Sequence, residues 1–167
     1  MKAIVVFESL WGNTAAAARA IAEGIGLEAQ AMTTSEAAGE AVAGADLIVA
    51  GAPVLGFRLP TEDMRESIRK NPGKAPAPPD LSQPSMRTWL EGLPEGHGCC
   101  AAFETRLRMS PGGSTSTILH DLEELGYRPI AKGGRFIVKG KYGPLRDGEL
   151  EKARHWGEEL AGVMAAP

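Results

Sequence analysis

The residues most suited to binding a ligand directly follow the first apolar run of the chain, which covers positions 2–7. They form a short turn ahead of an alanine-rich segment, and the turn reads Ser9-Leu10-Trp11-Gly12-Asn13-Thr14. The side chains of Ser9, Asn13 and Thr14 can supply hydrogen bonds. The first N–H groups of a helix that starts here have no partner inside the helix, and the helix dipole adds partial positive charge. A turn of this composition between a strand and a helix is suited to binding a phosphate group.

The turn differs from the two best-known phosphate loops. It contains no Lys or Arg, so neutral donors would hold the phosphate. It has neither the G-x-x-x-x-G-K-[ST] sequence of nucleotide hydrolases nor the G-x-G-x-x-G sequence of dinucleotide folds. The sequence therefore indicates a phosphate site of another type.

Strands and helices alternate along almost the whole chain. Apolar runs predict five strands, the last interrupted by Gly133-Gly134, at 2–7, 27–32, 46–51, 98–103 and around 130–138. Helical patterns cover 14–25, a short Ala/Glu-rich stretch after the second strand, 61–70, 86–92, 114–125 and the chain from Asp147 onward. Short strands separated by helices predict the α/β class, with a parallel sheet covered on both faces.

One segment interrupts this alternation. Residues 71–84 contain five prolines, so they cannot form a helix or a central strand. We interpret them as a surface insertion in one domain that spans residues 1–167. Because such a loop offers few backbone donors to the sheet, we expect it to be dispensable for folding. A lid or a partner-docking segment is the alternative interpretation.

Composition narrows the class of protein. The chain has 167 residues, 43% of them hydrophobic, and a net charge of −3, as expected for a globular protein with a sizeable core. The basic residues are dispersed, so no nucleic-acid partner is predicted. No apolar run is long enough for a signal peptide or a membrane span. We therefore expect a cytoplasmic protein that binds no membrane.

The reactive side chains predict no catalytic or metal site. His97, His120 and His155 lack metal-ligand spacing, and Ser9 lacks the G-x-S-x-G context of a nucleophile. The neighbours Cys99 and Cys100 lie in an apolar run. They are either a vicinal redox pair or small strand residues in a reducing cytosol, and we expect the second.

The segments that follow the first, third and fourth strands should meet, because ligands of an open parallel sheet bind beyond the carboxyl ends of its strands. The first is the turn described above. The second, at 52–58, is apolar and contains Gly56, and the third, at 104–113, is polar. A phosphate site, an apolar surface and a polar edge together suit a flat heterocycle that carries a monophosphate.

At these residues the chain resembles the flavodoxin family of FMN-binding proteins. The family's phosphate loop reads [ST]-x-T-G-[NQ]-T, which Ser9, Gly12, Asn13 and Thr14 match and Trp11 does not, since the family usually has a hydroxyl there. The resemblance covers nearly the whole chain except the proline-rich insertion. It implies a three-layer α/β/α sandwich with a five-stranded parallel sheet in the order 2-1-3-4-5, and FMN as the cofactor.

The resemblance also implies roles for the other two segments. Leu55 and Gly56 stand where the family packs an apolar side chain on the flavin, beside a glycine peptide that can turn over. Phe103 stands where the family borders the pyrimidine end of the ring. The implied FMN-binding residues are Ser9, Leu10, Trp11, Gly12, Asn13, Thr14, Pro53, Val54, Leu55, Gly56, Phe57, Phe103, Glu104, Thr105 and Arg106.

Three functions remain open at the level of sequence. The first, which we expect, is an electron carrier that shuttles electrons between a reductase and an acceptor protein, because the flavin itself supplies the chemistry. The second is an FMN-dependent NAD(P)H or quinone oxidoreductase that uses the insertion to build a substrate pocket. The third is a cofactor-free binding protein. The candidate loops also bring Arg58, Arg106 and Arg108 near the predicted ring, against Glu104 alone, which predicts a raised reduction potential.

Overall fold

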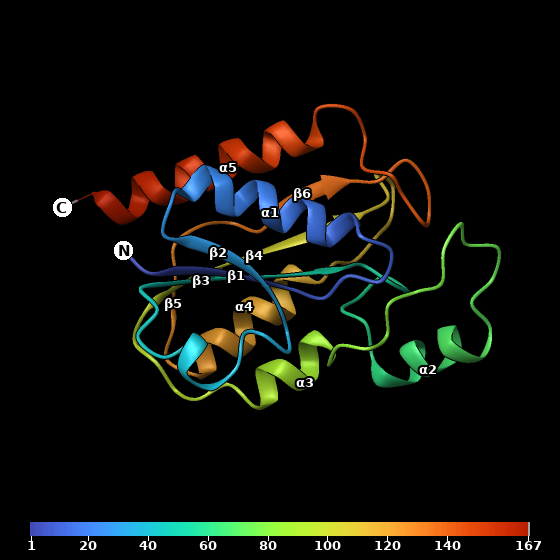
Figure 1. Ribbon diagram of the computed structural model, residues 1–167, viewed down its shortest axis with the longest axis horizontal. Helices are drawn as coiled ribbons and strands as arrows, with labels where there is room; N and C mark the ends of the chain where they lie inside the picture. Colours follow the sequence, from blue (N-terminus) through green and yellow to red (C-terminus); the bar gives the residue numbers. More distant parts are fainter. Residues whose placement is uncertain (167) are drawn as a thin grey trace.

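The computed structural model of the protein describes residues 1–166. Its centre is one sheet of parallel strands (Figure 1). The sheet order is β2-β1-β3-β4-β5, and a further strand, β6, also pairs with β4. The strands are β1 (Ala3–Phe7), β2 (Ala29–Thr33), β3 (Leu47–Pro53), β4 (Cys99–Arg106), β5 (Arg128–Pro129) and β6 (Gly134–Ile137). The predicted order is confirmed, and so is the interrupted last strand, which corresponds to β5 and β6.

Helices cover both faces of the sheet (Figure 1). One face carries α1 (Asn13–Ile25) and α5 (Glu149–Ala165), and the other carries α3 (Met86–Glu91) and α4 (Thr115–Glu124). This three-layer arrangement follows from the buried strands, whose successive side chains point to opposite faces. No helix in residues 1–166 is long and apolar enough to cross a bilayer.

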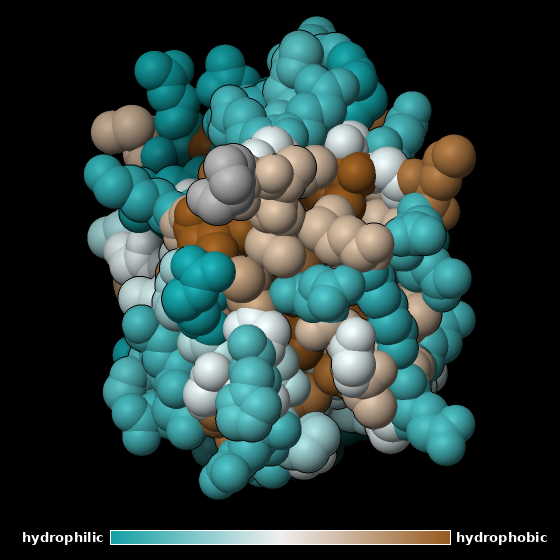
Figure 2. Space-filling model, turned by 90° about the vertical axis from the view of Figure 1, so that its left-hand side faces the viewer, coloured by the Kyte–Doolittle hydropathy of each residue, from teal (hydrophilic) through white to brown (hydrophobic). Residues whose placement is uncertain are grey.

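The carboxyl ends of the strands point to the right of Figure 1, towards α2 (Glu62–Lys70) and the proline-rich insertion. The N-terminus and the end of α5 lie at the opposite, amino-terminal edge. Figure 2 shows that edge face on, with apolar side chains in its centre and hydrophilic ones around them.

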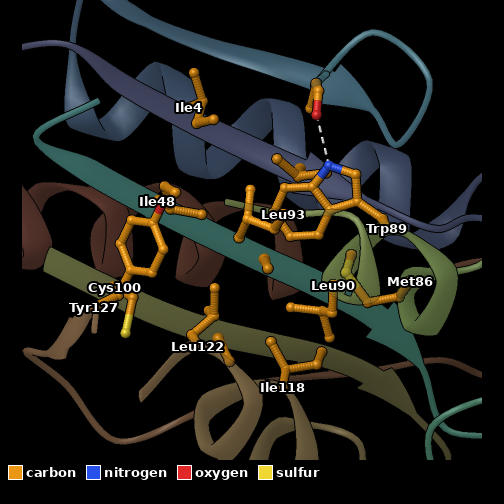
Figure 3. Close-up of a cluster of buried hydrophobic side chains, with 14 of the residues drawn as sticks. Ile4, Ile48, Met86, Trp89, Leu90, Leu93, Cys100, Ile118, Leu122 and Tyr127 are labelled. Atoms are coloured by element: carbon orange, nitrogen blue, oxygen red, sulfur yellow. Dashed lines mark hydrogen bonds between the residues drawn. The ribbon is translucent and has the colours of Figure 1, made fainter. Parts of the chain in front are cut away.

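Two hydrophobic clusters hold the layers together, one on each face of the sheet. Figure 3 shows the cluster beneath α3 and α4, in which Ile48, Leu90, Ile118 and Leu122 are buried. Trp89 packs in this cluster and donates from Nε1 to the carbonyl of Ala37 over 2.6 Å. The buried polar atom of this tryptophan is thus satisfied within the protein.

Cys99 and Cys100 are buried in the two different clusters, because they are successive residues of β4. Burial raises the pKa of the Cys100 thiol to about 12. A thiol of that pKa stays protonated at neutral pH and is unreactive as a nucleophile. The arrangement favours packing as the role of both cysteines.

Two predicted elements differ from the observed ones. The Ala/Glu-rich stretch after β2 contains only the short 3₁₀ helix η1 (Gly39–Ala41), because Gly39, its first residue, and Gly44, which follows it, adopt left-handed conformations. Strand β4 continues three residues past its predicted end at 103. It does so because β3 and β6 pair with these residues from both sides, which extends the ladder to Arg106.

The insertion is bound to the body of the protein more closely than its prolines suggest. The N–H of Asp80 donates to the carbonyl of Leu10, in the predicted phosphate turn, over 2.8 Å. Arg65, on α2, donates from Nη2 to the carbonyl of Gln83 over 2.6 Å. These bonds join the segment to the phosphate turn and to α2 rather than to the strands of the sheet.

Candidate functional site

The phosphate turn joins β1 to α1, and its shape depends on two residues. Gly12 precedes the helix with φ at +91°, a conformation that other residues adopt only at a cost. The hydroxyl oxygen of Ser9 accepts from the N–H groups of Gly12, over 3.1 Å, and Ala15, over 3.2 Å. Ser9 therefore closes the turn, and its own hydroxyl proton stays available for a ligand.

After Ser9, the turn presents four backbone N–H groups that donate to no acceptor in residues 1–166. They belong to Leu10, Trp11, Asn13 and Thr14. The last two are at the N-terminus of a 13-residue helix, whose dipole adds positive potential. Unpaired N–H groups in this position are a ready site for an anion such as phosphate.

The side chains of Asn13 and Thr14 hold neighbouring segments in place. Asn13 donates from Nδ2 to the carbonyl of Tyr142 over 3.1 Å, which fastens the segment at 138–145 to the turn. The hydroxyls of Thr14 and Thr105 are 2.7 Å apart, and this contact joins α1 to the end of β4. The turn is thus fixed by its side chains, and its open donors are mainly those of the backbone.

Trp11 occupies the position at which the phosphate loop of the flavodoxin family usually has a hydroxyl side chain. Its ring meets that of Tyr142 edge to face, with ring centroids 4.8 Å apart. Its Nε1 is buried and has no hydrogen-bond partner within residues 1–166. A buried unpaired donor is uncommon and calls for an explanation. A ligand acceptor beside the turn would satisfy it.

The second segment forms a tight hairpin turn after β3. The N–H of Leu55 donates to the carbonyl of Arg58 over 3.0 Å, and the N–H of Arg58 returns a bond to Leu55 over 3.1 Å. Gly56 and Phe57, between them, have φ values of +51° and +68°. Positive φ at both central residues defines a type I′ turn. It holds the Phe57 side chain outward, where 61% of its surface is exposed.

In the third segment, two of the predicted site residues are buried inside the protein. Phe103 is fully buried in the core beside Phe136, so it does not reach the candidate site. Glu104 is also fully buried, and it accepts from the N–H groups of Ser114 and Thr115 at the start of α4. Neither residue lines the cavity at this edge: Phe103 packs in the core, and Glu104 lies inside the sheet because β4 extends through Arg106.

Arg106 and Glu104 form a buried ion pair on one face of β4, with Nη1 and Oε1 2.7 Å apart. The guanidinium of Arg106 also donates to the carbonyls of Ser110 and Gly112, so it organises the loop at 107–113. Arg106 is therefore not the unopposed cation that the predicted rise in reduction potential requires.

These three segments surround a cavity of about 70 Å³, partly open to solvent, at the carboxyl edge of the sheet. Ten of the predicted residues line it, and all of them come from the ends of β1, β3 and β4 or the turns that follow. The lining residues are Ser9, Leu10, Trp11, Asn13, Thr14, Pro53, Val54, Leu55, Thr105, Arg106, Leu107, Val138 and Lys141. Gly12, Gly56 and Phe57 shape or border the loops without lining the cavity.

Sequence reasoning missed three of the lining residues: Leu107, Val138 and Lys141. Lys141 supplies a cation close to the turn, and its Nζ lies 5.4 Å from the centre of the Tyr142 ring. The signal that could have found it is the basic, glycine-containing run at 139–143 directly after the last strand. A phosphate bound at the turn would thus have a positive side chain nearby as well as neutral donors.

A second buried ion pair, between Glu8 and Arg65, lies next to the phosphate turn. Glu8, which ends β1, accepts from Nη1 of Arg65 over 2.6 Å and from the N–H of Met86 over 2.9 Å. Burial raises the pKa of Glu8, and the Met86 N–H and the Arg65 charge oppose that rise. Glu8 is thus a buried carboxylate that links the first residue of α3 to Arg65 on α2.

Comparison of sequences identifies no relative: no family model and no curated protein matches the chain. Comparison of structures does. A flavodoxin from the Archaea superposes with a TM-score of 0.68 at 21% identity, over 99% of this chain and 100% of its own. Flavodoxin 1 from Bacillus cereus gives 0.67 at 18% identity over 100% of both chains. A flavodoxin from Pseudomonas aeruginosa gives 0.66 at 18% identity over 99% and 100%.

The matches run over the full length of these flavodoxins, and the sheet order agrees with the resemblance seen in the phosphate turn. By structure, the chain is a protein of the flavodoxin-like α/β fold. Its candidate site lies where that class of open sheet binds ligands, at the carboxyl ends of β1, β3 and β4.

Proposed function

We propose that this protein binds FMN at the carboxyl edge of the sheet and carries electrons between a reductase and an acceptor protein in the cytoplasm. One observation carries the proposal: the four backbone N–H groups of the Ser9–Thr14 turn that have no acceptor in residues 1–166. They adjoin a cavity at the ligand-binding edge of a flavodoxin-like fold. FMN, when bound, would supply one-electron redox chemistry.

The residues present fit a flavin monophosphate. The turn N–H groups, the Ser9 hydroxyl and Lys141 would hold the phosphate, and the unpaired Trp11 Nε1 is a further donor on the cavity wall. Val54, Leu55 and other apolar residues of the wall would contact the ring. The turn therefore offers charge-compatible donors, and the wall excludes water from the apolar part.

The composition of the cavity wall favours a carrier over an enzyme. No His, Cys, Asp, Glu or Tyr is among the residues that line it. Its charged members are Lys141 and Arg106, and Arg106 is paired with Glu104. No side chain of the wall is thus suited to exchange a proton with a substrate near neutral pH. A protein that only binds and orients a flavin requires none.

The visible spectrum of the purified protein tests the proposal. We expect a yellow protein with an absorption band near about 450 nm, as bound flavins show, and calorimetric binding of FMN after the cofactor is removed. A colourless protein that takes up no FMN would contradict it and support a cofactor-free role. Steady-state oxidation of NADPH by the protein alone would instead favour an oxidoreductase.

A further inference from the structure

Positive side chains gather around the candidate site, although the whole chain carries a net charge of −3. They lie on the three loops at 55–58, 107–113 and 138–148. We call them the basic collar; they are Arg58, Arg108, Lys139, Lys141 and Arg146, all of them exposed. Among the described residues of these loops, Asp147 is the only carboxylate, and it lies 3.3 Å from Lys139.

Three exposed apolar side chains stand among these cations. Phe57, Leu107 and Met109 expose 61%, 45% and 88% of their surfaces. Leu107 and Met109 line a shallow groove together with three collar residues, Arg108, Lys139 and Arg146. Large apolar side chains exposed together and rimmed by charge are typical of a surface that binds another molecule.

The loops that carry this surface are fixed in place. The N–H of Gly113 donates to the carbonyl of Phe57 over 3.1 Å, which joins the first loop to the second. Arg106 ties the second loop to the buried Glu104. In the third loop, the N–H of Lys139 donates to Pro144 and that of Arg146 donates to Ile137, each over 2.8 Å. The collar is thus a preformed surface, which lowers the entropy lost on binding.

We propose that the basic collar and its apolar side chains dock a partner protein with an acidic surface. The proposal rests on the function given above, since this partner would exchange electrons at the cavity that the collar surrounds. Charge complementarity favours an acidic partner, because the collar has one carboxylate against five cations. The excess of negative charge elsewhere on the chain would orient the protein as the two approach, which speeds encounter at low salt.

Association with two haem proteins of opposite surface charge tests the proposal. The probes are cytochrome b5, which is acidic, and cytochrome c, which is basic, and binding is measured by calorimetry and by amide chemical shifts. The test variant is Arg108→Glu with Arg146→Glu, whose side chains do not line the cavity. The control is Lys132→Glu, which reverses an exposed charge outside the collar. The FMN content of each protein is measured separately.

We expect the wild-type protein to bind cytochrome b5 in preference to cytochrome c at low ionic strength. The double variant should bind cytochrome b5 about tenfold more weakly, the control should bind as the wild type does, and added salt should remove the difference. Preference for cytochrome c, or equal binding of cytochrome b5 by the double variant, would overturn the proposal. If the protein lacks FMN but keeps the charge-dependent binding, the carrier function fails and the docking surface stands.

Discussion

The two edges of the sheet differ in what their backbones leave unpaired. The amino-terminal edge holds the larger cavity, of about 670 Å³ against about 70 Å³ at the carboxyl edge. Yet its backbone donors are used: the N–H of Lys2 bonds to Asp46 Oδ2 over 2.7 Å, and that of Cys99 bonds to the Asp46 carbonyl over 2.8 Å. At the carboxyl edge, four N–H groups of one turn stay open within residues 1–166. Unpaired donors, rather than empty volume, mark the binding edge.

The direction of the chain explains this difference. In a parallel sheet with crossover helices, each helix begins at the carboxyl edge and ends at the amino-terminal edge. Helix starts leave N–H groups open, whereas the helix ends here are closed by bonds such as those from Gly26 to Ala22 and from Tyr127 to Leu122. The same topology also gives the carboxyl edge the positive ends of the helix dipoles.

The largest effect should come from breaking the ion pair beneath the phosphate turn. Arg65→Met leaves the buried Glu8 carboxyl without its cation, and loss of one partner of a buried pair costs about 3–5 kcal/mol of unfolding free energy. Urea unfolding measures it. The control is Arg69→Met on the same helix, whose exposed pair with Glu66 should change stability by less than about 1 kcal/mol. Equal effects of the two substitutions would contradict the structural role of the pair.

The same variant should change how stability depends on pH. The folded-state pKa of Glu8 is raised, so its favourable contribution is present at acidic pH and is lost as pH rises through that value. Removing Arg65 raises the pKa further and deepens the penalty for the charged form. The stability difference between Arg65→Met and the wild type should therefore shrink towards acidic pH and grow towards neutral pH. A difference that is constant with pH would show that Glu8 does not titrate in this way.

Substitution of two glycines, one at each edge, tests the comparison directly. Each has a positive φ, and a Cβ added at either would meet no other atom within 4 Å. They are Gly12 in the phosphate turn and Gly44 at the amino-terminal edge, with φ at +91° and +69°. Alanine at either position should cost about 1–2 kcal/mol of stability, since it strains the left-handed backbone. Only Gly12→Ala should also weaken FMN binding, by about tenfold, while riboflavin, which lacks the phosphate, loses less. Calorimetry with both ligands measures this, and equal FMN affinity in the two variants would break the comparison.

The indole N–H of Trp11 has no partner in residues 1–166, whereas that of Trp89 is hydrogen-bonded, so substitution of each by Phe tests the two cases separately. Trp11→Phe removes an Nε1 that has no protein partner, so stability should change little, while FMN binds about fivefold more weakly if this donor meets the ligand. Trp89→Phe removes an Nε1 that bonds to Ala37, which should cost about 1–3 kcal/mol of stability and leave FMN affinity unchanged. An unchanged FMN affinity in Trp11→Phe would show that the indole N–H of Trp11 does not bind FMN.

The smallest effect should come from the cation beside the turn. Lys141→Met should weaken FMN binding by about two- to threefold at low ionic strength, because an exposed charge is well screened, and the effect should vanish as salt is added. Lys132→Met, with an exposed side chain elsewhere, serves as the control and should bind FMN as the wild type does. If the loss caused by Lys141→Met does not depend on salt, the lysine acts through packing rather than through charge.

Local sequence was enough to predict the phosphate turn and most strands. Gly12 is flanked by hydroxyl and amide residues that shape such a turn, and apolar runs such as 46–51 form strands in most buried contexts. The interruption of the last strand could also be predicted, because paired glycines weaken a strand where they occur. These features depend on residues close together in the chain.

Tertiary structure decided the rest. Glu104 looks like a loop residue after the strand predicted to end at Phe103, but pairing with β3 and β6 draws it into the sheet, where it pairs with Arg106 two residues along on the same face. Lys141 reaches the turn only because Asn13 holds its loop there. The sequence by itself determined where the turn at 9–14 and a parallel sheet form, since turn chemistry and apolar periodicity are local. Only the fold decided which donors stay open and which charges are paired, because these depend on contacts between residues far apart in the chain.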